Sequence, residues 1–121
     1  MSDYLNINRN FVEKGWGYED WIVNKEKYCG KILFLKKDHM CSWHYHKIKD
    51  ETFYLQEGKL KVLYGYDEDI EKSESIVLEK GDSFHIPVGM IHRMIAIEDS
   101  YLFEFSTQHF DSDSYRIKKG N

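Results

Sequence analysis

Short runs of alternating apolar and polar residues follow one another along most of this chain. No segment longer than about two turns shows the apolar spacing of an amphipathic helix. Turn residues separate the runs, as at Glu57-Gly58, Lys80-Gly81-Asp82 and Pro87-Val88-Gly89. Because successive side chains of a strand point to opposite faces, this pattern predicts a chain built of strands. We expect them at residues 19–23, 29–36, 41–46, 51–55, 59–66, 75–78, 83–86, 91–97 and 101–106.

Many short strands at near-even spacing predict an all-β fold, either a sandwich or a closed barrel. Nine Tyr, seven Phe and three Trp favour strands, and a single proline fits a well-bonded sheet. With 121 residues the chain forms one domain. We expect the barrel core at about residues 16–106, with polar, irregular arms through about residue 10 and after about residue 111.

Composition and charge argue against several classes of partner. The net charge is −4, and no Lys/Arg cluster forms a stripe, so we expect neither nucleic acid nor an anionic membrane. No apolar run is long enough to cross a bilayer, and the first residues lack the features of a signal peptide. Cys29 and Cys41 have no framework spacing and are expected to be reduced thiols. These features predict a cytoplasmic protein.

Three histidines and one glutamate have the spacing of a metal-ligand set. His44 and His46 share one face of a strand, and Glu51 begins the next strand, so a hairpin can bring the three together. His92 follows the turn at residues 87–89 and can face them if the barrel closes. Three neutral imidazoles and a carboxylate suit Mn²⁺, Fe²⁺, Co²⁺, Ni²⁺ or Zn²⁺. The alternative is a polar core cluster that holds no metal.

Four protein ligands leave two positions of an octahedral ion for water or substrate. Such an open site favours chemistry or ligand capture over a purely structural role.

The two segments that carry these ligands resemble the motifs of the cupin superfamily. The first motif, G-x5-H-x-H-x3,4-E-x6-G, matches from His44 to Gly58, and the second, G-x5-P-x-G-x2-H-x3-N, matches from Gly81. Asp38 replaces the leading glycine of the first motif, and Ala96 the final asparagine of the second. The resemblance implies a double-stranded β-helix, also called a jelly-roll barrel. It also implies that the metal ligands are His44, His46, Glu51 and His92.

Within cupins, the flanking sequence resembles the cupin domain of type II mannose-6-phosphate isomerase / mannose-1-phosphate guanylyltransferase proteins. GWGYE at residues 15–19 is similar to their PWG-x-Y, and DSDSYR at residues 111–116 is similar to E-D-D-I-x-R. Residues 42–51 resemble S-L-Q-x-H-x2-R-x-E, with His44 for Gln and Lys49 for Arg. The family continues into D-x-Y-G-R, whose arginine is implicated in isomerisation, whereas this chain reads IKKGN at residues 117–121.

An isomerase also needs a base, and a phosphorylated substrate needs a cation. The candidates for the base are His85, Glu104 and Tyr45, of which His85 lies just before the turn at Pro87. Each has a structural alternative, as a core or surface side chain. Lys49 and Arg116 are the candidates for substrate binding, with ordinary solvated charges as the alternative.

Three functions remain open on the sequence. The first is a metal-dependent isomerase or epimerase acting on a sugar or sugar phosphate. The second is an Fe²⁺ cupin dioxygenase with an apolar pocket. The third is a non-catalytic sugar-binding cupin that is accessory to carbohydrate biosynthesis. In each case we expect a small-molecule ligand, and we expect a homodimer because the edges and aromatic faces of a small barrel are usually covered.

Overall fold

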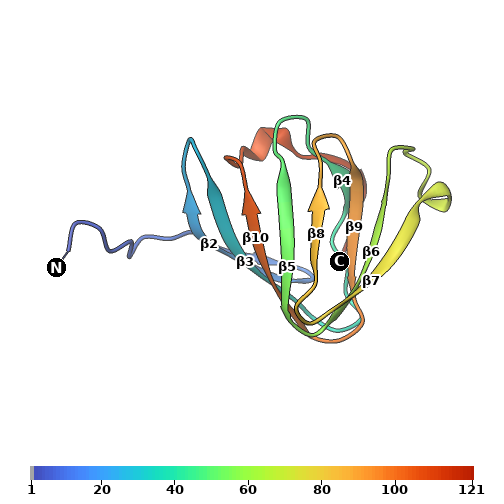
Figure 1. The fold of residues 1–121 in the computed structure, drawn as a ribbon, viewed down its shortest axis with the longest axis horizontal. Coiled ribbons are helices and arrows are strands. Elements are labelled where there is room, and N and C mark those ends of the chain that lie inside the picture. The colour runs from blue at the N-terminus through green and yellow to red at the C-terminus, as the bar shows by residue number, and fades with distance from the viewer. Residues whose placement is uncertain (1) are drawn as a thin grey trace.

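The computed structural model describes residues 2–121 and consists of two antiparallel β-sheets that pack face to face (Figure 1). The six-stranded sheet has the order β1-β2-β3-β10-β5-β8, and the five-stranded sheet has the order β11-β4-β9-β6-β7. The first sheet contains β1 (Phe11–Lys14), β2 (Gly17–Asn24), β3 (Cys29–Leu35), β5 (Glu51–Glu57), β8 (Ser83–Ile86) and β10 (Ser100–Ser106). The second contains β4 (Trp43–Tyr45), β6 (Lys59–Gly65), β7 (Glu74–Glu79), β9 (Ile91–Ala96) and β11 (Tyr115–Lys118).

The hydrophobic core lies between the two sheets. Along β3 and β5 buried residues alternate with partly exposed ones, as the period of two requires. Leu35, Leu55, Leu60 and Leu102 are fully buried and come from strands of both sheets. Two 3₁₀ turns lie between strands, η1 (Ile70–Lys72) between β6 and β7 and η2 (Asp111–Asp113) between β10 and β11. The predicted all-β double-stranded β-helix is therefore confirmed.

Three segments differ from the sequence expectation. Residues 11–14, where no strand was expected, form β1 and pair with β2. The strand expected at residues 41–46 is reduced to β4, so His46 lies in the loop that follows it. The segment after residue 111, expected to be an irregular arm, instead contains η2 and the strand β11, which pairs with β4. This short, mostly polar run has no apolar periodicity that would predict a strand. It becomes a strand only by pairing with β4, which is about 70 residues away in sequence.

The turn between β5 and β6 depends on a glycine. Gly58 has φ of +101°, in the region that disfavours residues with a side chain. A Cβ atom at this position would overlap the carbonyl oxygen of Asp99 and the hydroxyl of Ser100. The glycine of the first motif therefore allows the loops at this end of the barrel to pack against each other.

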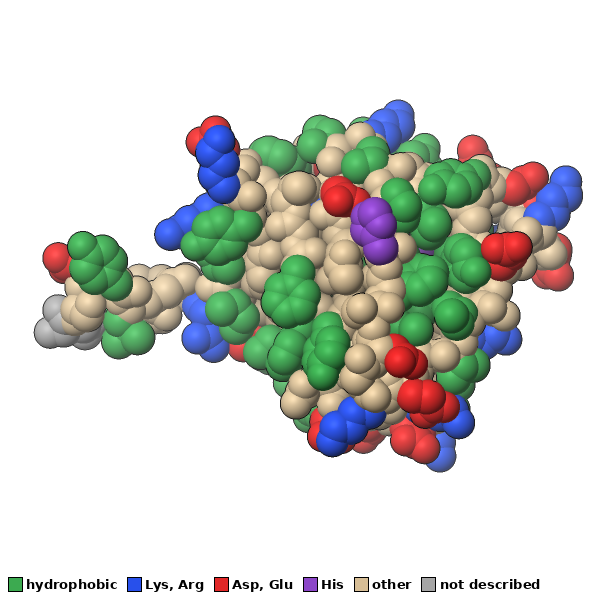
Figure 2. Space-filling view, viewed as in Figure 1, with side chains coloured by type: hydrophobic (Ala, Val, Ile, Leu, Met, Phe, Trp, Pro, Cys, Tyr) green, Lys and Arg blue, Asp and Glu red, His purple; other side chains and the backbone are tan. Residues whose placement is uncertain are grey.

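Aromatic side chains form a row on the six-stranded sheet. Neighbouring ring centroids are 4.8 Å apart for Phe11 and Tyr18, 5.4 Å for Tyr18 and Phe34, and 4.9 Å for Phe34 and Tyr101. Phe11 and Tyr101 are exposed, and Figure 2 shows several hydrophobic side chains on the face viewed there. The homodimer remains a prediction. Within residues 2–121, no helix has the length and apolar character needed to cross a membrane.

Candidate metal centre and cavity

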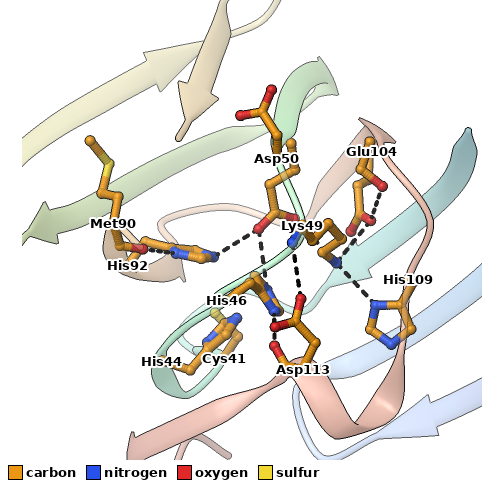
Figure 3. Close-up of polar contacts among 12 residues, drawn as sticks. Cys41, His44, His46, Lys49, Asp50, Met90, His92, Glu104, His109 and Asp113 are labelled. Atoms are coloured by element: carbon orange, nitrogen blue, oxygen red, sulfur yellow. Dashed lines mark hydrogen bonds and ion pairs between the residues drawn. The ribbon is translucent and has the colours of Figure 1, made fainter. Parts of the chain in front are cut away.

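Three histidines come together at one end of the barrel interior. His44 on β4 lies directly opposite His92 on β9, and His46 follows β4 by one residue. One ring nitrogen of each lies within 4.8 Å of the other two. Glu51 is the first residue of β5 and is 2% exposed. The hairpin and the second motif thus bring the four predicted ligands to one place. Figure 3 shows the three histidines together.

Backbone carbonyl groups fix the orientation and tautomer of all three imidazoles. The Nδ1 atoms of His44, His46 and His92 lie 2.9, 2.7 and 3.0 Å from the carbonyl oxygens of Ser42, Asp113 and Met90. A carbonyl oxygen can only accept a hydrogen bond, so each Nδ1 must carry the proton. In a neutral ring the Nε2 atom then presents a lone pair. Metal-bound histidines are commonly oriented by such carbonyl contacts.

The carboxylate of Glu51 has an oxygen without a hydrogen-bond donor. Its Oε2 lies 3.3 Å from Nε2 of His46 and 3.4 Å from Nε2 of His92, yet it is buried without a hydrogen bond. When these rings are neutral, with the proton on Nδ1, their Nε2 atoms carry lone pairs, and electron-rich atoms then face one another across a small space. A divalent cation would offset the repulsion between these electron-rich atoms, and the nitrogen and oxygen donors suit a borderline metal ion. The residues present therefore fit a metal.

The charge states also suit metal binding. Burial lowers the pKa of His44 well below its usual value, and the neighbouring His92 and His46 rings lower it further. Burial likewise lowers the pKa of His92, so both rings are neutral at neutral pH. Burial alone would raise the pKa of Glu51, but the ammonium group of Lys49, 3.4 Å from its Oε1, holds it well below its usual value. These are the protonation states that a metal ligand needs.

Cys41 lies in the same cavity but is poorly suited to be a ligand. Burial raises the pKa of its thiol to about 11, so the thiolate is scarce at neutral pH. Its Sγ atom accepts a hydrogen bond from the backbone N–H of Met94 at 3.1 Å. Cys29 and Cys41 are both free and buried, in agreement with the expected reduced thiols.

A buried lysine connects Glu51 to a second carboxylate. The Nζ atom of Lys49 lies 3.4 Å from Oε1 of Glu51 and 3.2 Å from Oε2 of Glu104, and it donates to Nδ1 of His109 at 3.1 Å. Burial alone would lower the pKa of Lys49, but Glu104 and Glu51 outweigh it and raise the pKa above its usual value. All three donors of the ammonium group thus have an acceptor. Figure 3 shows the contacts of Lys49 with Glu104 and His109.

These groups line a cavity of about 790 Å³. Apolar side chains, among them Trp16, Leu33 and Phe53, form part of its wall, and residues from the N-terminal segment and from β11 complete it. The charged residues that line it are Lys14, Lys31, Lys49, Arg116 and Lys119, and Glu19, Glu51, Glu104 and Asp111.

The cavity separates the other predicted site residues into two groups. Glu104, Lys49 and Arg116 line it. His85 and Tyr45 are not among its lining residues. His85 lies on the outer side of β8, with a side chain that is 57% exposed and bonded to Asp50 at 2.7 Å. Tyr45 stacks on Tyr115, with ring centroids 5.2 Å apart. We therefore do not retain His85 or Tyr45 as candidates for the base.

Sequence reasoning missed two residues that support this centre. His109 was not singled out, although it bonds to Lys49 and its Nε2 donates to Asp111 at 3.0 Å. Burial lowers its pKa to about 4, so the ring is neutral. Asp113 lay in a segment noted only for its resemblance, and its role requires a contact between residues more than 60 positions apart. An acidic residue in a polar run gives no sequence signal for such a contact.

Asp113 holds the loop between His46 and Glu51. Its carboxylate accepts hydrogen bonds from the backbone N–H groups of Lys47 (2.8 Å), Ile48 (3.1 Å) and Lys49 (2.9 Å). Its carbonyl oxygen also fixes the ring of His46. The side chain is buried, so no solvent replaces it as an acceptor.

We expect Asp113→Ala to weaken metal binding by about 10- to 100-fold, because a loosened loop no longer holds His46 and Glu51 in register. Competition of the protein with a chromophoric chelator for Zn²⁺ measures this. Asp99→Ala is the control, since Asp99 caps the backbone N–H of Lys37 in a loop outside the cavity. Equal affinity of the Asp113 variant and the wild type would contradict the supporting role.

Comparison with known proteins agrees with this geometry. Residues 32–105 match the family model described as the cupin domain. The chain belongs to the cupin family. This cupin is 39% identical over 93 residues to the uncharacterized protein YdbB of Bacillus subtilis (strain 168), a match covering 77% of this chain and 74% of that protein.

Solved structures share the cupin fold at lower identity. The capsular polysaccharide assembling protein CapF from Staphylococcus aureus superposes with a TM-score of 0.81 at 17% identity, over 93% of this chain and 33% of that one. Oxalate decarboxylase from Bacillus subtilis gives a TM-score of 0.78 at 19% identity, over 90% and 30% of the two chains. The cupin thus spans about a third of each of these proteins, and at such identities the likeness concerns the fold alone.

Proposed function

We infer that this cupin is a metal-dependent enzyme that acts on a sugar or sugar phosphate as an isomerase or epimerase. The observation that carries this inference is the buried set of three Nε2 lone pairs and one Glu51 oxygen, joined through Lys49 to Glu104 in one polar cavity. Aldose–ketose isomerisation needs a Lewis acid and a base close together. The resemblance of residues 15–19 and 111–116 to the mannose-6-phosphate isomerase type supports this substrate class.

His44, His46, Glu51 and His92 would hold a divalent ion, which when bound polarises a carbonyl and the neighbouring hydroxyl. Glu104 is the candidate for moving a proton between the two adjacent carbons. Lys49 and the hydroxyl of Ser106 bond to its Oε2 at 3.2 and 3.1 Å. These contacts hold the carboxylate in place through Oε2, which leaves Oε1 as the oxygen that would accept the proton.

Arg116 is the candidate for a phosphate contact. It lines the cavity from β11 and lies opposite His44 in the strand register. A guanidinium group matches the oxygen pairs of a phosphate better than an ammonium group does. A phosphorylated sugar could therefore bind near the metal and the cation at once.

The test is conversion of aldose and ketose phosphates in D₂O, followed by NMR, with metal-stripped and metal-reconstituted protein. We expect interconversion with deuterium at the carbon next to the carbonyl in the reconstituted protein only. Glu104→Gln should retain the metal and lose at least about 100-fold in rate, the contribution typical of a positioned base. Binding of a sugar phosphate without turnover would instead support the non-catalytic cupin.

A second candidate is an Fe²⁺ dioxygenase, because part of the cavity wall is apolar. Phe53 and Met94 line it near the histidines, with the ring centroids of Phe53 and His92 6.4 Å apart. Oxygen consumption by the iron-loaded protein with an aromatic or other apolar substrate, and none with sugar phosphates, would favour this function over the isomerase.

A further inference from the structure

One wall of the cavity carries a second buried cation that the metal centre does not use. Lys31 on β3 lies opposite Trp21 on β2 and opposite Glu104 on β10 in the strand register. Its side chain is 2% exposed and lines the cavity. Phe53, which contacts the ring of His92, lies two strands further along the same row. Two strand spacings, roughly 10 Å, therefore separate Lys31 from Phe53 along this wall.

The ammonium group of Lys31 has fewer partners than that of Lys49. Its Nζ lies 3.4 Å from Oε1 of Glu19 and 4.0 Å from the ring centroid of Trp21. Within residues 2–121, Glu19 is its only hydrogen-bond acceptor, whereas Lys49 has three. A buried ammonium has three donors and is costly to leave underbonded. Lys31 therefore retains donor capacity beside the cavity.

Glu19 holds this arrangement in place. Its Oε1 accepts a hydrogen bond from the indole Nε1 of Trp21 at 2.9 Å as well as the contact from Lys31. The aromatic ring and the ammonium are thus fixed against each other. A ligand that enters here meets a flat apolar surface and a cation together.

The charge of the whole cavity favours an anion once a divalent ion is bound. Five cationic side chains and four carboxylates line it, so the side chains alone are nearly balanced. The two positive charges of the metal then make the interior positive. This charge would attract an anionic group.

We propose that Lys31 and Trp21 form a second recognition subsite, which binds the anionic group of the substrate while the metal centre holds its other end. The shared chemistry is that of a phosphate monoester or a carboxylate, with Lys31 donating to an oxygen and Trp21 packing against the adjoining carbon atoms. This rests on the proposed function, because it concerns the anionic group of the same substrate, for which Arg116 is the other candidate cation.

The experiment is calorimetric titration of the Zn²⁺-loaded protein with inorganic phosphate and, separately, with acetate. Lys31→Met should weaken binding of the preferred anion by at least about tenfold, because a desolvated charge-assisted hydrogen bond is lost. Lys37→Met, an exposed lysine outside the cavity, should bind as the wild type does. Tighter phosphate binding indicates a phosphate monoester, and tighter acetate binding a carboxylate.

A double variant separates the subsite from general charge effects and from poor folding. Lys31→Met with Glu19→Gln leaves the net charge unchanged and no carboxylate unpaired, so it should fold and still lose the anion. Unchanged affinity in both variants, or no binding of either anion by the wild type, would overturn the subsite. Metal content measured in the same samples tests the proposed function separately. If the metal is retained but anion affinity does not depend on Lys31, the subsite is contradicted and the proposed function is not.

Discussion

Replacement of His92 with alanine is expected to reduce the metal content of the purified protein from stoichiometric to near zero. His92 is 1% exposed, and the carbonyl oxygen of Met90 orients its ring. The Nε2 atom of His92, like that of His46, therefore lies close to the unbonded oxygen of Glu51. Changing a residue that only orients a ligand costs about 10- to 100-fold in affinity, so loss of a ligand itself should exceed about 100-fold. Elemental analysis after dialysis against metal-free buffer measures this.

His46→Ala and Glu51→Ala should behave in the same way as His92→Ala. His85→Ala is the matched control, because it also removes an imidazole but from the exposed side of β8. It should retain the metal of the wild type. Stoichiometric metal in the His46, Glu51 and His92 variants would show that the ion, if any, is held elsewhere.

Lys49→Met is expected to lower the free energy of unfolding of the metal-free protein by about 3–5 kcal/mol, the usual cost of leaving a buried charge without its partner. Glu51 and Glu104 are 2% and 3% exposed, and each lies within 3.4 Å of this one ammonium group. Methionine keeps the apolar stem of the side chain but removes the ammonium group, so two buried carboxylates lose the cation that they share. Urea unfolding followed by circular dichroism measures the change.

Metal should reduce this loss, because an ion bound at Glu51 takes over part of the charge compensation. The comparison variant is Lys80→Met, which removes an exposed ion pair with Glu57 at 3.0 Å. Exposed pairs of this kind contribute at most about 1 kcal/mol. If Lys49→Met lowers the free energy of unfolding no more than Lys80→Met does, the buried contacts of Lys49 with Glu51 and Glu104 do not stabilise the fold.

The sequence could predict that the four candidate ligands lie together, because their positions follow from local rules. His44 lies on a strand and Glu51 begins one, so the period of two and one hairpin suffice to bring them together. The same rule could also have predicted the position of His85. His85 lies between Phe84 and Ile86, both of which are less exposed than it, so alternation alone places His85 on the outer face.

Other features depend on contacts that no local pattern encodes. Lys49 was expected to bind substrate, but it is enclosed by Glu51, Glu104 and His109, which come from distant parts of the chain. The strand β11 and the caps supplied by Asp113 arise only when the C-terminal segment folds back onto β4. Such residues are specified by the closed barrel as a whole.

X-ray absorption spectroscopy of the Zn²⁺-reconstituted protein tests the central claim most directly. We predict imidazole nitrogen and carboxylate oxygen neighbours at about 2.0–2.2 Å, with the outer-shell scattering of three histidines. Sulfur at about 2.3 Å, which would implicate Cys41, or fewer than three imidazoles around the ion, would contradict the assignment of His44, His46, Glu51 and His92 as the metal-binding set.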